Sequence, residues 1–344
     1  MPSPRPFPHS RRAISTLILW LHAAGPVLML ATATSAQEQT DLTRAASEEK
    51  EILRTIPGAE TVPPEMAELV ELVGDNQRPL NVYAGLDYVS QYIARGLVFV
   101  DEPSLQPWAE VDVSLSRDVD TNGPLGGMSF FAGNWNNINL ASGSDGIARS
   151  GSAADLKDWY ETDIYAGLRL SLHENLLVSF RYNYYTSPSD SFADIGELDF
   201  RIAWDDSSFW GDRVELTGFR LTPRVRIAKE LDDGGGPEQW FFSPRLTPSF
   251  VLDGLPNDPR INFPLILGLG ADGQYIDSTT GEDETFGFFQ TGVAVDLPLD
   301  VLPSEGGALS VTGAVDVYIL ADENLSPNQD RTEVVARFGV SYSF

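Results

Sequence analysis

Apolar and polar positions alternate with a period of two from residue 81 to the C-terminus. The last stretch shows the pattern most plainly: one face carries Val334, Phe338 and Phe344, and the other carries Glu333 and Arg337. Such alternation predicts β-strands that each present one apolar face. Clusters of Gly, Pro, Asp, Asn and Ser predict the turns between them. Twelve strands are predicted, at residues 81–95, 107–116, 127–136, 159–172, 175–186, 196–205, 213–229, 238–252, 261–275, 285–297, 308–320 and 331–344.

A uniformly apolar face recurs on nearly every predicted strand. Leu198, Phe200 and Ile202, for example, oppose Glu197 and Asp199. Each strand with its loop has about 22 residues, and a strand that crosses a membrane needs about 9–11. We therefore expect an all-β fold, a transmembrane antiparallel β-barrel of about 12 strands with a lipid-facing exterior and a polar lumen. Six tryptophans lie near predicted strand ends, as aromatic girdles at the membrane interfaces would require: Trp108, Trp135, Trp159, Trp204, Trp210 and Trp240.

The N-terminal residues have the pattern of an export signal. Arg11 and Arg12 precede an uncharged run at residues 13–33, and residues 34–36 are small. This order predicts a secretory signal peptide at residues 1–36, cleaved near Ala36, with an uncleaved membrane anchor as the alternative. Residues 37–80 are expected to form a periplasmic segment that is partly helical, or else a solvated linker. The barrel is then expected to occupy residues 81–344.

Charge and composition exclude several classes of protein. The 344 residues include 50 acidic and 23 basic side chains, so the net charge is −27 and a nucleic-acid interface is not expected. The absence of cysteine excludes disulfides and thiolate chemistry. His173, in a predicted turn, is the one histidine outside the signal peptide. We therefore do not expect an enzyme. A membrane lipid hydrolase that depends on His173 is kept as the third alternative for the function.

No sequence motif predicts a cofactor or a metal ion. No phosphate-binding loop, dinucleotide fingerprint or spacing of metal ligands stands in a suitable context. Three acidic clusters, Asp232-Asp233, Glu282-Asp283-Glu284 and Asp322-Glu323, are interpreted as solvated loop tips, with divalent-cation contacts as the alternative.

Several short motifs carry a resemblance to a known family. Residues 90–96 read Ser-Gln-Tyr-Ile-Ala-Arg-Gly, residues 161–167 read Glu-Thr-Asp-Ile-Tyr-Ala-Gly, and residues 184–188 read Tyr-Tyr-Thr-Ser-Pro before Glu197-Leu198. These segments resemble the Gcw-type proteins, also called TorF-family porins, although Gln91 replaces the usual Asp and Ser187 a common aromatic. The resemblance covers roughly residues 81–205. It implies a small outer-membrane barrel with channel function and no established substrate.

Charged side chains gather on the faces opposite the apolar ones, so we expect them to line the lumen. Buried charges must be paired or hydrated. They would therefore form either a salt-bridged ladder that fills the interior or opposite-sign patches beside a narrow water path. Arg220, Arg224 and Arg226 form a basic stripe on one predicted strand that would attract anions. The candidate pore-lining residues are Arg169, Arg181, Arg201, Arg220, Arg224, Arg226, Arg245, Arg337, Asp87, Glu110, Asp112, Asp163, Glu197, Asp199, Asp316 and Glu333.

The predicted function is that of an outer-membrane porin-like channel for passive diffusion of small polar or charged solutes. A closed structural or adhesion barrel without transport is the alternative. The expected partners are outer-membrane lipid, small solutes and the barrel-assembly machinery, which would recognise the C-terminal strand ending at Phe344.

Overall fold

The computed structural model describes residues 79–116, 125–140, 159–172, 175–211, 213–231, 238–277, 280–302, 307–322 and 330–344. The predicted signal peptide and nearly all of the predicted periplasmic segment, up to residue 78, lie outside the described residues. Neither prediction is therefore tested. Among the described residues, no helix is long and apolar enough to cross a membrane.

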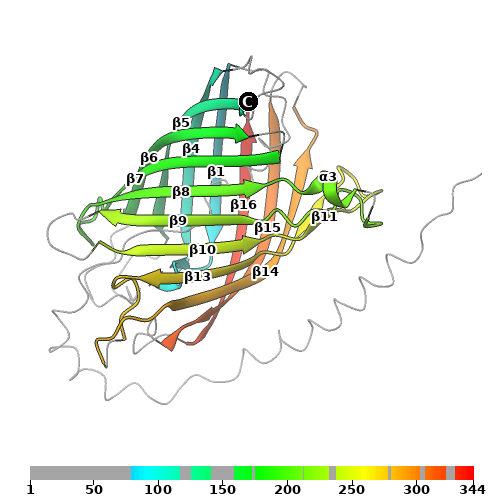
Figure 1. Ribbon diagram of the computed structural model, residues 1–344. Helices are drawn as coiled ribbons and strands as arrows, with labels where there is room; N and C mark the ends of the chain where they lie inside the picture. Colours follow the sequence, from blue (N-terminus) through cyan, green and yellow to red (C-terminus); the bar gives the residue numbers. More distant parts are fainter. Residues whose placement is uncertain are drawn as a thin grey trace, which may run out of the picture. The chain divides into compact units, whose positions relative to one another are not determined.

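Twelve strand positions form one closed antiparallel barrel (Figure 1). Each of the twelve strand positions pairs with the next position along the chain, and β14 pairs with both β13 and β15, while β1 pairs with β16. The barrel fold predicted from the sequence is thus confirmed. Ten positions hold one strand each: β1 (Leu80–Val89), β4 (Ser104–Ser116), β5 (Leu125–Asn139), β6 (Trp159–Leu172), β7 (Leu176–Thr186), β8 (Ile195–Trp204), β9 (Arg224–Leu231), β14 (Phe286–Leu299), β15 (Ala308–Leu320) and β16 (Thr332–Ser343). Two positions are interrupted: β10 (Trp240–Leu246) continues as β11 (Ser249–Val251), and β12 (Arg260–Asn262) continues as β13 (Leu265–Ala271).

The barrel is apolar outside and polar inside. On β8, Leu198 is 51% exposed, whereas its neighbour Glu197 is 0% exposed. Phe180 on β7 and Phe338 on β16 are exposed in the same way. A soluble sheet would bury these side chains, so the pattern is that of a wall in contact with lipid.

Both described ends of the chain lie at the same end of the barrel, which we call the termini end. The start of β1 and the end of β16 are joined there by hydrogen bonds between the backbones of Val82 and Phe344, at 2.8 and 2.9 Å. Because the strands alternate in direction, β1, β5, β7, β9, β13 and β15 end at the opposite end of the barrel, which we call the far end.

Besides the two interrupted positions, two further predicted strands differ from the structure. The first ends at Val89 rather than at residue 95, because residues 92–94 belong to a separate hairpin. The strand predicted at residues 213–229 begins only at Arg224. The residues before it form turns and the one-turn helix α3 (Ser207–Trp210), and Asp206 accepts hydrogen bonds from the backbone of Leu221 and Thr222 at 3.0 Å.

Only some of the six tryptophans lie where the predicted aromatic girdles at the membrane interfaces would place them. Trp159 and Trp204 are exposed on the outer face, at the ends of β6 and β8. Trp108 and Trp135 are instead buried on the inner face, at 7% and 1% exposure. Trp108 lies over Gly85 of the neighbouring strand, where any β-carbon would collide with the indole ring. These two rings fill the lumen rather than contact lipid headgroups.

Candidate functional site in the barrel lumen

A two-stranded hairpin follows the first barrel strand and forms a sheet of its own. It consists of β2 (Tyr92–Ala94) and β3 (Leu97–Val100), joined by Arg95 and Gly96. Both loop residues have positive φ, 49° and 75°, as a two-residue type I′ turn requires. Glycine adopts this conformation freely, and Arg95 is held in it by the contacts described below.

Both faces of this hairpin are buried against the inner wall of the barrel. Ile93 and Val98 belong to one apolar cluster with Phe241 and Phe288 on the wall. Tyr92 and the opposite face of the hairpin belong to a second cluster. That cluster includes Trp108, Trp135 and Tyr160, and the ring centres of Tyr92 and Trp135 are 5.6 Å apart. A hairpin in solution would leave one face exposed, so this one lies inside the barrel. We call residues 90–103 the plug segment.

Polar contacts show that the plug segment crosses the lumen. Near its start, Gln91 Nε2 donates to Glu333 Oε2 on β16 at 3.0 Å. At the hairpin tip, Arg95 forms an ion pair with Glu197 on β8. Strands β16 and β8 are six positions apart in the ring of twelve and therefore face each other. Between them, the Tyr92 hydroxyl donates to Glu161 on β6 at 2.7 Å.

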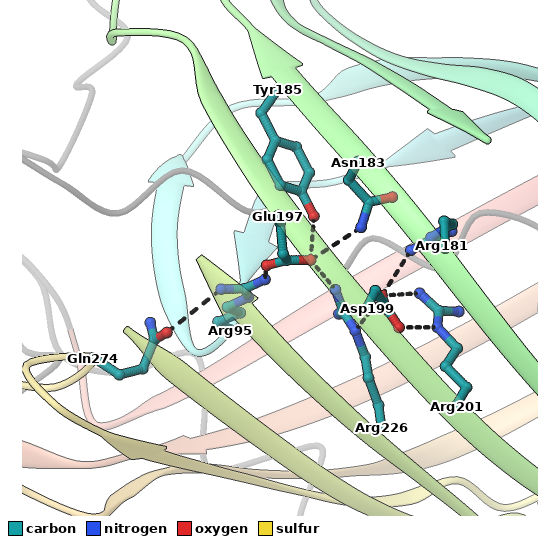
Figure 2. A network of polar contacts seen from close by, with 9 residues as sticks. All are labelled: Arg95, Arg181, Asn183, Tyr185, Glu197, Asp199, Arg201, Arg226 and Gln274. Atoms are coloured by element: carbon teal, nitrogen blue, oxygen red, sulfur yellow. Dashed lines mark hydrogen bonds and ion pairs between the residues drawn. The ribbon is translucent and has the colours of Figure 1, made fainter. Parts of the chain in front are cut away.

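The tip residue Arg95 is buried, and the side chains around its guanidinium form a pocket; Figure 2 shows two of them, Glu197 and Gln274. Its guanidinium donates to Glu197 Oε2 and, at 3.4 Å, to Gln274 Oε1, and it lies 4.8 Å from the centre of the Phe241 ring. The Tyr275 hydroxyl donates to the backbone carbonyl of Arg95 at 3.2 Å. Burial alone would lower the pKa of Arg95, but the carboxylate of Glu197 outweighs it and the pKa is raised. The guanidinium group of Arg95 therefore stays charged.

A second carboxylate beside this pocket gathers three of the predicted arginines. Asp199 on β8 accepts from Arg201 at 2.9 and 3.0 Å, from Arg181 at 3.1 Å and from Arg226 at 2.7 Å. Arg226 also reaches Glu197 at 2.8 Å, which links the two carboxylates. Figure 2 shows these side chains converging from β7, β8 and β9. In this part of the lumen the charged side chains are paired with one another, as the alternative of a salt-bridged ladder would have them.

Other predicted residues form separate groups on other strands of the wall. Arg169 on β6 binds Glu110 and Asp112 on β4, at 2.7 and 2.9 Å, and lies over the ring of Phe131. Arg337 and Asp316, on neighbouring strands, are 3.7 Å apart. Three further acids also lie inside the barrel: Asp87 accepts from the indole of Trp108 at 3.0 Å, Glu333 contacts the plug segment, and Asp163 is buried on β6.

The remaining predicted arginines lie nearer the termini end. Arg224 and Arg245 are direct cross-strand partners on β9 and β10, where like charges oppose each other. Arg220 lies outside β9, in an isolated bridge with Ser249, so the predicted stripe on one strand is broken between residues 220 and 224. Side chains of the inner wall at this end are partly exposed and mostly small and polar, namely Ser114, Ser129, Ser171, Ser310, Thr312 and Ser341. Among the described residues, the inner wall is thus more exposed toward the termini end, whereas the plug segment fills the lumen toward the far end.

Arg95 lies in the lumen but is not among the residues that the sequence predicts there. The alternating pattern assigns residues 90–95 to the first strand, and residues 90–96 stand out only as a family-like motif. A signal was present: two short apolar runs, residues 92–94 and 97–100, flank the pair Arg95-Gly96 without alternating. Such runs around a glycine-containing pair indicate a hairpin buried on both faces.

Some earlier candidates have no described geometry. His173, Asp232-Asp233 and Glu323 lie outside the described residues. Glu282 and Asp283 are exposed in the connection between β13 and β14. In the described part of the chain, no group of three or more acidic, histidine or cysteine side chains is arranged to hold a metal ion.

Comparisons with known proteins give similarity at the level of the barrel. No protein-family profile and no curated protein sequence matches the chain, so the resemblance to TorF-family porins remains an expectation. Among solved structures, it is similar to the COG4313 outer membrane channel from Pseudomonas putida F1 (11% identity, 77% of this chain, 94% of that chain, TM-score 0.43). It is also similar to the NanC porin (12%, 76%, 98%, 0.35) and to a TodX monoaromatic hydrocarbon channel mutant (8%, 79%, 91%, 0.31). Outer membrane channels and porins are thus among the barrels that this chain is similar to, and scores this low carry no argument about a solute.

Proposed function

We propose that this protein is an outer-membrane channel for small polar or charged solutes, and that the plug segment closes it. In the closed state that we propose, solvent enters from the termini end and stops at the hairpin. Movement of the hairpin out of the lumen would complete the water path.

One observation carries this proposal: the obstruction is a loop hairpin, and the wall behind it carries carboxylates as well as apolar side chains. Glu161, Glu197 and Glu333 are wall carboxylates that contact the plug segment through side chains. When the hairpin leaves, these groups would face water, which solvates charge at little cost. A wall built only to enclose a hairpin would be expected to be apolar on every side of it.

The closed structural barrel remains the alternative, since the same contacts would stabilise a permanent plug. The two functions differ in whether the lumen conducts once the hairpin is absent. A channel wall would then pass solutes, whereas the ion-paired side chains of a structural barrel would still block it.

A solute-uptake assay separates them. The plug variant replaces residues 91–101 with a flexible Gly-Ser segment, and the purified protein is reconstituted into liposomes loaded with an impermeant osmolyte. We expect swelling in small sugars or amino acids with the plug variant and little swelling with wild type. The control replaces residues 253–258, an exposed turn at the termini end, and should behave as wild type. A plug variant that assembles but does not swell would reject the channel.

The outer-membrane location and the route into it belong to the same proposal. Export through cleavage near Ala36 would deliver the chain to the periplasm, where the assembly machinery would bind the last strand. The position of Phe344 beside Val82, at the seam between the first and last strands, supports a role for this residue in closing the barrel.

A further inference from the structure

We infer that the pocket around Arg95 is a binding site for the guanidinium group of a small cationic solute, and that Arg95 occupies it as a tethered substitute. The inference deepens the proposed channel, because it names a solute class that competes with the plug. It rests on the geometry of four side chains: Glu197, Gln274, Phe241 and Tyr185.

The two oxygens of Glu197 have different partners. Oε1 accepts from Arg226 at 2.8 Å, from Asn183 at 3.0 Å and from the Tyr185 hydroxyl at 2.8 Å. Oε2, among the described residues, accepts from Arg95. The wall therefore holds one oxygen rigidly and leaves the other for a group that comes from the lumen. Without Arg95, Oε2 would be a buried carboxylate oxygen in need of a cationic donor.

The other components select a planar cation with two donors. Gln274 supplies a second acceptor, 3.4 Å from the other terminal nitrogen of Arg95. Phe241 supplies an aromatic face 4.8 Å from the guanidinium carbon. A guanidinium can stack on the ring while its forked nitrogens reach both acceptors, which a compact ammonium cannot do in one position. The pocket is thus specific for the group rather than for positive charge in general.

The pocket is part of the wall rather than of the plug. Glu197 and Tyr185 lie on β8 and β7, Phe241 lies on β10, and Gln274 lies in the connection before β14. All four are buried. Removal of the Arg95 side chain therefore leaves three strands and one loop to preserve the site. A solute that takes the place of Arg95 would remove the hairpin's contact with β8.

The test uses binding in detergent, so it does not depend on conduction. The Arg95→Ala variant is titrated with methylguanidinium and, separately, with methylammonium at equal ionic strength, by calorimetry and by the midpoint of thermal unfolding. We expect methylguanidinium to bind and to raise the midpoint, and methylammonium to do neither. In wild type the tethered Arg95 competes at a millimolar effective concentration or higher, so apparent affinity should be weaker by about tenfold or more.

The matched control is the double variant Arg95→Ala/Glu197→Gln, which keeps the shape of the pocket and removes its charge. We expect it to lose binding. Equal binding by the double variant, equal effects of the two cations, or no binding to Arg95→Ala would overturn the inference. If Arg95→Ala does not assemble, the plug variant exposes the same pocket and takes its place. Binding without liposome swelling would reject the channel and keep the site, while swelling without binding would do the reverse.

Discussion

Removing the charge of Asp199 should destabilise the barrel strongly if the network around it is dry. Asp199 is 3% exposed and accepts four hydrogen bonds from three guanidiniums, at 2.7 to 3.1 Å. The substitution Asp199→Asn preserves the size of the side chain but leaves three buried cations with one carboxylate fewer. Breaking a buried ion pair typically costs about 3–5 kcal/mol. Because the three pairs share one acceptor, their costs are not additive, and we expect a total loss in this same range.

The measurement is the free energy of unfolding in urea for protein folded into lipid vesicles. The control is Glu238→Gln, since Glu238 pairs with Lys229 at the surface, with a side chain 51% exposed. Such an exposed pair should cost about 0–1 kcal/mol. The double variant Asp199→Asn/Arg201→Gln should recover part of the loss, because it removes one of the uncompensated cations. A loss below about 1 kcal/mol for Asp199→Asn would refute the dry network and show that water solvates these arginines.

Three further predictions concern packing, assembly and selectivity. Gly268→Ala should lower the thermal unfolding midpoint, because the new β-carbon would collide with the ring of Phe288. Adding Phe288→Ala to the same chain should restore part of the lost midpoint. An unchanged midpoint for Gly268→Ala would contradict this packing. Deletion of Phe344, whose backbone pairs with Val82, should lower the yield of heat-modifiable protein in the outer membrane, whereas a normal yield would show that the terminal aromatic is dispensable. Arg220→Ala, introduced into the plug variant, should shift the reversal potential under a salt gradient toward cation preference, while an unchanged potential would place Arg220 outside the ion path.

The barrel could be predicted from the sequence because lipid imposes a strict local rule. Each crossing strand must present apolar side chains on one face, so Leu198 and Phe180 reveal their orientation without knowledge of their neighbours. The side chains of Arg169, Arg201 and Asp199, which the same alternation assigns to the lumen, are buried in the structure. The number and order of the barrel strands followed from counting these segments.

The contents of the lumen could not be predicted in the same way, because they depend on contacts between distant segments. The alternation along β8 indicates that Glu197 faces inward. It does not indicate that a hairpin 102 residues earlier in the chain supplies the partner of this carboxylate. Position near a strand end was misleading for two tryptophans: Trp108 and Trp135 are near strand ends, yet they face the plug segment. The break before Arg224 arises from Asp206, which binds the backbone of Leu221 and Thr222 and holds them in a turn.

The central claim, that the plug segment leaves the lumen when the channel opens, can be tested on a single variant. Because the chain has no cysteine, Gln91→Cys and Glu333→Cys introduce its only two thiols, at residues whose side chains are in contact. A short cross-linker that a reductant can cleave then fixes the hairpin to β16, and planar-bilayer recordings compare the same channels before and after cleavage. The account predicts that step-like openings are absent while the cross-link is intact and appear after it is cleaved. Openings that are equally frequent in both states, or absent from both, would contradict it.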